Sequence, residues 1–224
     1  MEELYFRQIQ AGPMANFVYL VGSLKTREAV IVDPAWHVKE LLEIAQNDDM
    51  KITGMLITHS HQDHAGGDFM GQHIEGVAEM LELCPAKVYI HKTEAEKLSV
   101  PLSEIVQTDE HTTLALDPFK IEFIHTPGHT PGSQCFKLND RLVSGDTLFI
   151  GSCGRTDLPN SNPEDLYDSL TQKLMKLDEQ TLVFPGHNYA PGQTYTSIHQ
   201  EKAQNPFFNF PSKSAFLSAM GYGQ

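Results

Sequence analysis

The stretch Thr58-His59-Ser60-His61-Gln62-Asp63-His64-Ala65-Gly66-Gly67 decides how this chain is interpreted, because it gathers three imidazoles and a carboxylate within six residues. It follows the short apolar run 51–57, which is typical of a buried strand. Packing does not explain four such side chains together, since polar groups buried without partners cost free energy. The stretch therefore predicts a metal site on the loop after that strand.

Length and composition favour one domain. A chain of 224 residues with 40% hydrophobic content can bury a sizeable core. We expect a single domain over residues 1–224, with a short C-terminal tail from about residue 194 to 224 packed on it. Aromatic side chains are usually buried, so we expect the tail to pack through Phe207, Phe208 and Phe210.

The charge balance excludes some classes of partner. A formal net charge of -13 argues against nucleic acid, whose binding draws on Lys and Arg. No apolar run is long enough to span a bilayer, and the acidic start Met1-Glu2-Glu3-Leu4 is unlike a signal or transit peptide. We therefore expect a cytoplasmic protein that acts on small molecules, away from membranes, with Cys84, Cys135 and Cys153 as free thiols.

The periodicity alternates between strands and helices. Strands are predicted at 4–9, 15–21, 29–32, 51–57, 87–90, 134–138, 141–143 and 181–184, the last of these being the final strand, with two more between 111 and 124 that break at Asp117-Pro118. Helices are predicted at 38–46, along the face Ile74, Val77, Ala78 and Leu81, after a Thr93–Glu96 capping box, and from Pro163 through Leu166, Leu170, Leu174 and Leu177. For the segment 70–83, a cap over the active site and a surface helix both stay open.

Further metal-competent residues follow other predicted strands. They are His129 in the loop 125–132, Asp146 after the 134–143 hairpin, and His187 after the strand 181–184. Together with the first stretch they make five histidines and two carboxylates, too many for one tetrahedral zinc but suited to two metals that share a bridging carboxylate. Ligands without thiolate fit zinc, with iron or manganese as alternatives.

The remaining histidines have no convergent neighbours in the sequence. We interpret His37, His73, His91, His111 and His199 as structural. His125 is intermediate, because it shares a loop with His129 and could support a ligand from behind.

The complete pattern resembles the metallo-β-lactamase fold superfamily, whose motif matches His59, His61, Asp63, His64, His129, Asp146 and His187. The resemblance covers nearly the whole chain and implies an α/β fold, a four-layer αββα sandwich with the metals at one edge between two sheets. It implies one metal on His59, His61 and His129, a second on Asp63, His64 and His187, and Asp146 between them. Asp33 would orient the motif loop from outside the ligand set.

Within the superfamily, the sequence is similar to glyoxalase II (hydroxyacylglutathione hydrolase) and to persulfide dioxygenase. Residue 146 is Asp, where secreted zinc β-lactamases usually carry Cys or Ser, and residue 61 is His, where flavodiiron oxygen reductases carry Glu. The loop 151–159 and the block 186–189 also resemble these thiol-conjugate enzymes.

The resemblance suggests Arg155 and Tyr189 as substrate-binding residues for an acidic small-thiol conjugate. A guanidinium can hold a carboxylate in a bidentate pair. The alternative for Arg155 is an ion pair that braces its own loop. The chain departs from glyoxalase II in its short C-terminal region, where only Lys202 and Lys213 are basic.

The leading hypothesis is hydrolysis of a glutathione-like thioester or related acyl bond by a metal-bound hydroxide, with Asp63 orienting the nucleophile and accepting its proton. The alternative is a persulfide dioxygenase with a single Fe(II) on His59, His129 and Asp146. Ala65-Gly66-Gly67 and Gly186 favour the hydrolase. A non-catalytic metal-binding module is a third possibility, and the sequence leaves the oligomeric state open.

Overall fold

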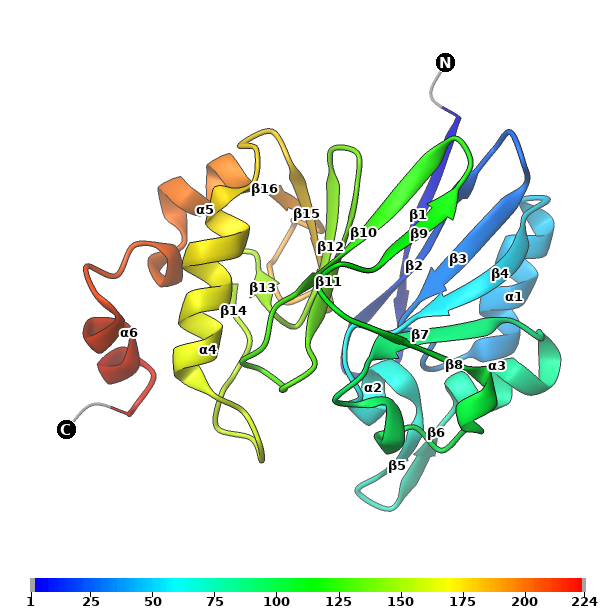
Figure 1. The fold of residues 1–224 in the computed structure, drawn as a ribbon, viewed down its shortest axis with the longest axis horizontal. Coiled ribbons are helices and arrows are strands. Elements are labelled where there is room, and N and C mark those ends of the chain that lie inside the picture. Colours follow the sequence, from blue (N-terminus) through cyan, green and yellow to red (C-terminus); the bar gives the residue numbers. More distant parts are fainter. Residues whose placement is uncertain (1–2, 223–224) are drawn as a thin grey trace.

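Two six-stranded sheets form the centre of the computed structural model, which describes residues 3–222 (Figure 1). The first has the order β1-β2-β3-β4-β7-β8, with β1 (Leu4–Ala11), β2 (Asn16–Ser23), β3 (Glu28–Val32), β4 (Lys51–Leu56), β7 (Lys87–His91) and β8 (Ile105–Thr108). The second has the order β16-β15-β12-β11-β10-β9, with β9 (Thr113–Leu116), β10 (Phe119–His125), β11 (Gln134–Leu138), β12 (Arg141–Gly145), β15 (Leu182–Pro185) and β16 (Thr196–Ser197).

Helices cover the outer face of each sheet (Figure 1). The first sheet carries α1 (Val38–Asn47) and α3 (Val77–Leu83). The second carries α4 (Pro163–Asp168), which continues through η3 (Ser169–Lys173) and η4 (Leu174–Lys176), together with α5 (Ile198–Gln204), η5 (Pro206–Phe208) and α6 (Lys213–Ala219). The predicted four-layer αββα sandwich is confirmed.

Alternation along the strands separates the three apolar layers, because successive strand residues point to opposite faces. In β2, Val18 and Leu20 pack toward α1 and α3, whereas Phe17, Tyr19 and Val21 pack between the sheets. Strands such as β2 are buried on both faces and therefore read as continuous apolar runs.

The strand directions bring several loops to one edge. β3, β4 and β7 run parallel to one another, as do β12 and β15 in the other sheet. Parallel strands place their carboxyl ends on the same edge of a sheet. The loops after β4, β12 and β15 therefore gather there, joined by the loop between β10 and β11.

The tail packs on the second sheet through Phe208 and Phe216, which are buried, with Phe207 and Phe210 against them. Near its start, Thr196 and Ser197 pair with β15 as β16. The strand 181–184 is therefore not the last. No helix in residues 3–222 has the length and apolar character needed to cross a membrane.

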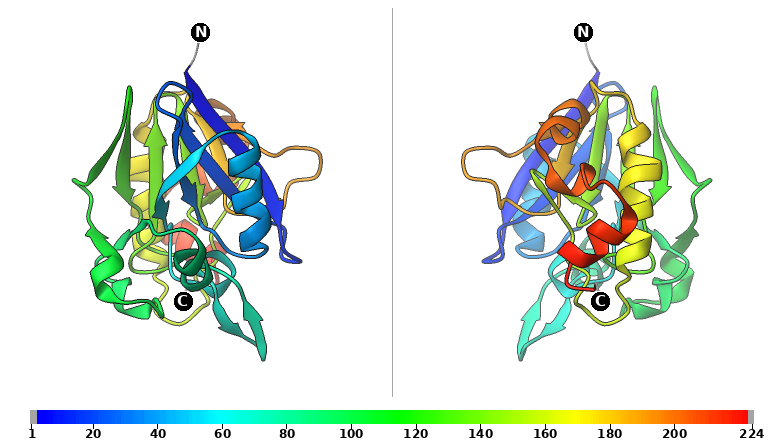
Figure 2. Two further views of the ribbon diagram at one scale, coloured as in Figure 1. Left: turned by 90° about the vertical axis from the view of Figure 1, so that its right-hand side faces the viewer. Right: turned by 90° about the vertical axis from the view of Figure 1, so that its left-hand side faces the viewer.

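The structure corrects two local predictions. Ile74 is not on a helix: it ends β6 (Gln72–Ile74), which pairs with β5 (Gly67–Phe69), and Gly76 precedes the start of α3. This hairpin turns at Met70 and Gly71, both at positive φ, and projects from the body of the molecule (Figure 2). The Thr93–Glu96 capping box is also absent, because the Thr93 hydroxyl bonds to His91 and only the short η1 (Ala95–Lys97) follows.

Other elements gave little sequence signal. The prediction lacked β8, and it also lacked the two-residue strands β13 (Leu148–Phe149) and β14 (Ser152–Cys153). The short η2 (Leu102–Glu104) was not predicted either. Of the segment 70–83, the helical part α3 packs on the first sheet through Val77 and Met80, so it does not cap the active site.

Candidate metal centre

The seven predicted donor residues lie together at the edge where the two sheets meet. Four of them lie in the loop after β4 and in the short helix α2 (Gln62–Ala65), which this loop leads into. The others follow β10, β12 and β15 in the second sheet. The rings of His59, His64, His129 and His187 are all at most 3% exposed.

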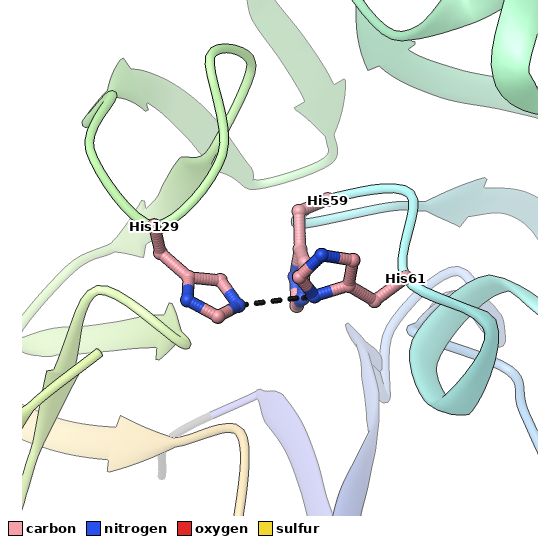
Figure 3. A group of neighbouring side chains, drawn as sticks. All are labelled: His59, His61 and His129. Atoms are coloured by element: carbon pink, nitrogen blue, oxygen red, sulfur yellow. Dashed lines mark hydrogen bonds between the residues drawn. The ribbon is translucent and has the colours of Figure 1, made fainter. Parts of the chain in front are cut away.

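His59, His61 and His129 form what we call the first donor group. The Nδ1 atom of His61 lies 3.1 Å from the Nε2 atom of His59 and 3.1 Å from the Nε2 atom of His129 (Figure 3). The rings meet edge to face, so three ring nitrogens point at a common centre. This is the arrangement that a tetrahedral cation takes from three imidazoles.

Asp63, His64 and His187 form the second donor group. The Nε2 atoms of His64 and His187 are 3.1 Å apart, and the Oδ2 atom of Asp63 is 3.4 Å from each of them. The group therefore offers two imidazoles and one carboxylate to the same point.

Asp146 lies between the two donor groups. Its Oδ2 atom is 3.7 Å from His129 Nε2 and 3.3 Å from His187 Nε2, and its Oδ1 atom is 3.4 Å from His64 Nε2. Within residues 3–222, the buried Oδ1 atom has no hydrogen-bond partner. A glycine is needed beside it, because a Cβ atom on Gly186 would lie 2.3 Å from Oδ1.

The outward nitrogens of four donor histidines have hydrogen-bond acceptors. His129 Nδ1 donates to the carbonyl of Arg155 at 2.9 Å, and His187 Nδ1 donates to the carbonyl of Met14 at 3.0 Å. The Nδ1 atoms of His64 and His59 face Asp33 Oδ2 and the Thr58 hydroxyl, each at 3.0 Å. In a neutral imidazole, a protonated Nδ1 leaves a lone pair on Nε2.

The lone pairs on the inward Nε2 atoms indicate whether the site fits a cation. His64 Nε2 and His187 Nε2 face each other at 3.1 Å, and without a hydrogen between them two lone pairs repel. A divalent cation between the rings would turn this repulsion into coordination, and it would also partner the orphaned Asp146 oxygen. The donor set therefore fits metal.

The pKa shifts indicate the same demand for positive charge. Burial, with the neighbouring imidazoles, lowers the pKa of His59 far below its usual value and that of His61 to about 4, so both rings are neutral ligands. Burial also opposes charge on His64, yet Asp63, Asp146 and Asp33 outweigh it and raise the pKa of that ring to about 10. A proton or a metal ion is needed among these carboxylates.

Asp33 supports the motif loop from behind. Its Oδ1 atom accepts the Thr58 N–H at 2.7 Å, and its Oδ2 atom accepts the Thr58 hydroxyl at 2.6 Å. Since the same Oδ2 atom also faces His64, one buried carboxylate orients the loop and a donor ring. The resemblance implied only that Asp33 orients the motif loop, and the contact with His64 was not part of that prediction.

Asn16 is a site residue that sequence reasoning missed. Its side-chain amide donates to Asp63 Oδ2 at 2.9 Å, and Trp36 Nε1 donates to Asn16 Oδ1 at 3.1 Å. Asn16 begins β2, far from any metal motif in the chain. Only its burial, at 1% exposure, distinguishes it, and no sequence pattern carries that information.

A cleft of about 570 Å³ opens above the donor groups. Its walls include both polar and apolar side chains, among them Phe69, Lys97, Arg155, Leu158, Pro159 and Tyr189. The Tyr189 ring stacks on the His187 ring, with centroids 4.6 Å apart. The Arg155 guanidinium pairs with Asp157 through two contacts of 2.6 and 2.7 Å, so the structure shows the loop-bracing ion pair.

The other histidines lie apart from the donors. His125 stacks face to face on His91, with centroids 3.9 Å apart, and it bonds to the carbonyl of Pro131. It therefore contacts the His129 loop but none of the donor rings. His73 bridges Asp68 and Glu79 at the surface, and His199 bonds to Glu179. Among the described residues, none of these four belongs to a group that could hold a metal ion.

Comparison with known proteins assigns this chain to one protein family. The model of the metallo-beta-lactamase superfamily matches residues 11–187. The chain is 33% identical to the hydroxyacylglutathione hydrolase GloC of Haemophilus influenzae over 83% of this chain and 90% of the relative. It is 30% identical to the mitochondrial persulfide dioxygenase ETHE1 of Homo sapiens over 97% of this chain and 81% of the relative.

Solved structures agree with this placement. The crystal structure of ETHE1 from Myxococcus xanthus superimposes with a TM-score of 0.84 at 33% identity, covering 97% of this chain and 90% of that one. The protein TTHA1623, solved in a di-iron-bound form, gives a TM-score of 0.71 at 29% identity, covering 90% of this chain and 99% of that one.

Proposed function

This chain belongs to the metallo-beta-lactamase superfamily, and on that premise we propose that it is a two-metal hydrolase that cleaves the thioester of a small, acidic thiol conjugate. The observation that carries the proposal is the completeness of the second donor group. Asp63, His64 and His187 converge as closely as the first group does, and hydrogen bonds fix both rings with their lone pairs inward. A hydrolase that uses two metals needs this group, whereas a single Fe(II) on His59, His129 and Asp146 does not.

The donor residues would hold two cations, one in each donor group. His59, His61 and His129 would hold one cation, Asp63, His64 and His187 the other, and Asp146 would contact both. Zinc fits these ligands, and so do iron and manganese. When bound, the pair supplies water acidified toward neutrality and polarises the acyl oxygen.

In this proposal, Asp63 handles the proton of the attacking water. The Asn16 amide holds its Oδ2 atom on the side of His64 and His187. Among residues 3–222, Oδ1 makes no hydrogen bond, so it is free to accept a proton within the cleft. A thiolate leaves readily, so Asp63 need not also protonate the leaving group.

The cleft walls suit a thiol conjugate that carries negative charge. Lys97 and Arg155 line the cleft, while Phe69, Leu158 and Pro159 provide apolar surface. Tyr189 lies flat on His187 at the boundary between the donors and solvent. We propose Arg155 and Tyr189 as contacts of the thiol carrier, a small molecule of the glutathione type.

The second candidate function is persulfide dioxygenation with a single iron. The similarity to persulfide dioxygenase over nearly the whole chain favours it. His59, His129 and Asp146 lie close enough to supply the two-His, one-carboxylate set that such iron needs.

Metal analysis and two assays separate the candidates. Protein purified without added metal is analysed for metal content, then tested for hydrolysis of acyl-glutathione thioesters and for oxygen uptake with glutathione persulfide. We expect two metal ions per chain, thioester hydrolysis and no oxygen uptake. One iron per chain with oxygen uptake would overturn the proposal in favour of the dioxygenase.

A matched pair of variants ties the result to the second donor group. His187→Ala should abolish hydrolysis, because it removes a ring nitrogen of that group. His125→Ala removes a histidine that is not a donor and should leave hydrolysis intact. Oxygen uptake that survives in His187→Ala would again indicate the single-iron enzyme.

A further inference from the structure

His61 differs from the other donor histidines in how it is held. The rings of His59, His64, His129 and His187 each have an acceptor for the outward Nδ1 atom. His61 uses Nδ1 as its inward nitrogen, and in the described part of the chain its Nε2 atom makes no hydrogen bond. Its position therefore depends on the backbone that carries it.

Glu94 holds that backbone. It follows β7 and is fully buried. Its Oε2 atom accepts the N–H of Ser60, the residue between His59 and His61, at 2.6 Å. Its Oε1 atom accepts the N–H of Gly132, in the loop that carries His129, at 3.1 Å. One carboxylate thus joins two donor loops that belong to different sheets.

A second bridge between these loops acts elsewhere. Gln134 N donates to the carbonyl of Thr58 at 2.9 Å, and Gln134 Nε2 donates to the carbonyl of Ile57 at 2.8 Å. Both contacts precede His59, whereas the Glu94 contact follows it. The segment that carries His61 therefore takes its cross-sheet support from Glu94.

We propose that Glu94 is a positioning residue for the first donor group, which fixes His61 through the Ser60 N–H and holds it in register with His129. The proposal rests on a metal at the first donor group and not on the reaction that follows. Hydrogen bonds to an ionised carboxylate are stronger than those to a neutral amide. The amide of Glu94→Gln has only one oxygen that can accept a hydrogen bond, and its NH₂ group would face the second backbone N–H without accepting from it. Either the Ser60 N–H or the Gly132 N–H would then lose its partner.

The test measures metal affinity without substrate. Chelator-stripped protein is titrated with Co²⁺ in competition with a chromophoric chelator, and His129→Ala and His187→Ala assign the two binding steps. We expect Glu94→Gln to weaken the step of the first donor group about ten- to a hundredfold, as removal of partners outside the ligand set generally does. The step of the second group should change by less than about twofold.

Glu201→Gln is the matched control. Glu201 is also a buried carboxylate, and its Oε2 atom accepts a loop N–H, that of Gly151, at 2.9 Å. The Glu201→Gln substitution should leave both metal-binding steps as in the wild type. Equal weakening of both steps in Glu94→Gln, or none in either, would overturn the proposal. A thioester assay that fails on the wild type would refute the hydrolase and leave this result unaffected.

A double-mutant cycle shows whether Glu94 acts through His61. In the His61→Ala background, Glu94→Gln should cause little further loss at the first step, because the ring that Glu94 positions is gone. An undiminished loss in that background would contradict the role assigned to Glu94. Glu94→Asp, which keeps the charge and shortens the reach, replaces Glu94→Gln in the cycle if the latter does not fold.

Discussion

Two clusters bring histidine rings together in this molecule, and they differ in where the nitrogens point. In the donor groups the rings meet edge to face, their inward nitrogens converge, and carboxylates lie between them. In the pair His91–His125 the rings stack with an interplanar angle of 7°, and their nitrogens bond to Thr93 and to the Pro131 carbonyl. The proximity of histidines is therefore a poor sign of metal, whereas the convergence of ring nitrogens with carboxylates between them is a good one.

The largest expected effect is at Asp146, which contacts both donor groups. Asp146→Ala should lose most of the bound metal and reduce activity by more than about a hundredfold, beyond the usual effect of residues that only support ligands. Metal analysis and the thioester assay measure both. Asp157→Ala removes the same charge from the ion-pair partner of Arg155 and should keep its metal. Metal retention in Asp146→Ala would show that the donor set is assigned wrongly.

Asp33 tests the importance of the acceptor behind the ring. Asp33→Asn leaves one acceptor oxygen for the Thr58 N–H, the Thr58 hydroxyl and His64 Nδ1, so we expect about ten- to a hundredfold weaker binding at the second donor group. Thr58→Val removes the hydroxyl that faces His59 Nδ1 and donates to Asp33 Oδ2, but it leaves Asp33 Oδ2 facing His64. It should therefore act mainly on the first group. Competition titrations distinguish the two, and identical profiles would contradict this division.

The stacked pair should affect stability and not metal binding. Burial and the neighbouring His125 lower the pKa of His91 from 6.5 to about 4. The unfolded chain therefore takes up a proton that the folded chain refuses, so this contribution to stability is present above 6.5 and is lost as the pH falls from there toward 4.

As the pH falls from about 7 to about 5, the free energy of unfolding should therefore decrease less in His91→Gln than in the wild type. Urea unfolding at each pH measures this difference. The metal content of His91→Gln should equal that of the wild type. A variant that keeps the wild-type pH dependence would show that His91 is not the group responsible.

The smallest effect is expected at Arg155, whose backbone and side chain serve different purposes. The carbonyl orients His129, and substitution of the side chain leaves it in place. Arg155→Ala should therefore keep its metal and raise KM at most about fivefold, since exposed ion pairs contribute under about 1 kcal/mol. Asp157→Ala frees the guanidinium and should lower KM if Arg155 binds the thiol carrier. Equal KM values in both variants would favour the bracing role alone.

The sequence predicted those parts of the site that depend on local pattern. Three histidines and a carboxylate after one strand, and single donors after others, indicated a shared metal site, and the family resemblance implied its place at one edge between the sheets. The partners Asn16, Glu94 and the Met14 carbonyl could not be predicted, because they act across long stretches of chain. These partners can be recognised only from their burial and contacts in the folded state.

The fold shows the same division. The family resemblance implied the sandwich, and long strands with alternating or continuous apolar residues, such as β2, matched a strand pattern. The hairpin β5–β6 did not, because each of its strands has three residues and the helical face predicted at Ile74 is interrupted by Gly76. Short elements are held by contacts with the rest of the molecule, which a local pattern does not contain.

Each donor group draws two residues from the loop after β4 and one from the opposite sheet. A cation in either group would therefore act as a crosslink between the halves of the sandwich, and mass action would couple the folded population to metal supply. At a free metal concentration a thousandfold above Kd, this coupling is worth about 4 kcal/mol per ion. Metal starvation would thus shorten the lifetime of the protein against proteolysis as well as stop its chemistry.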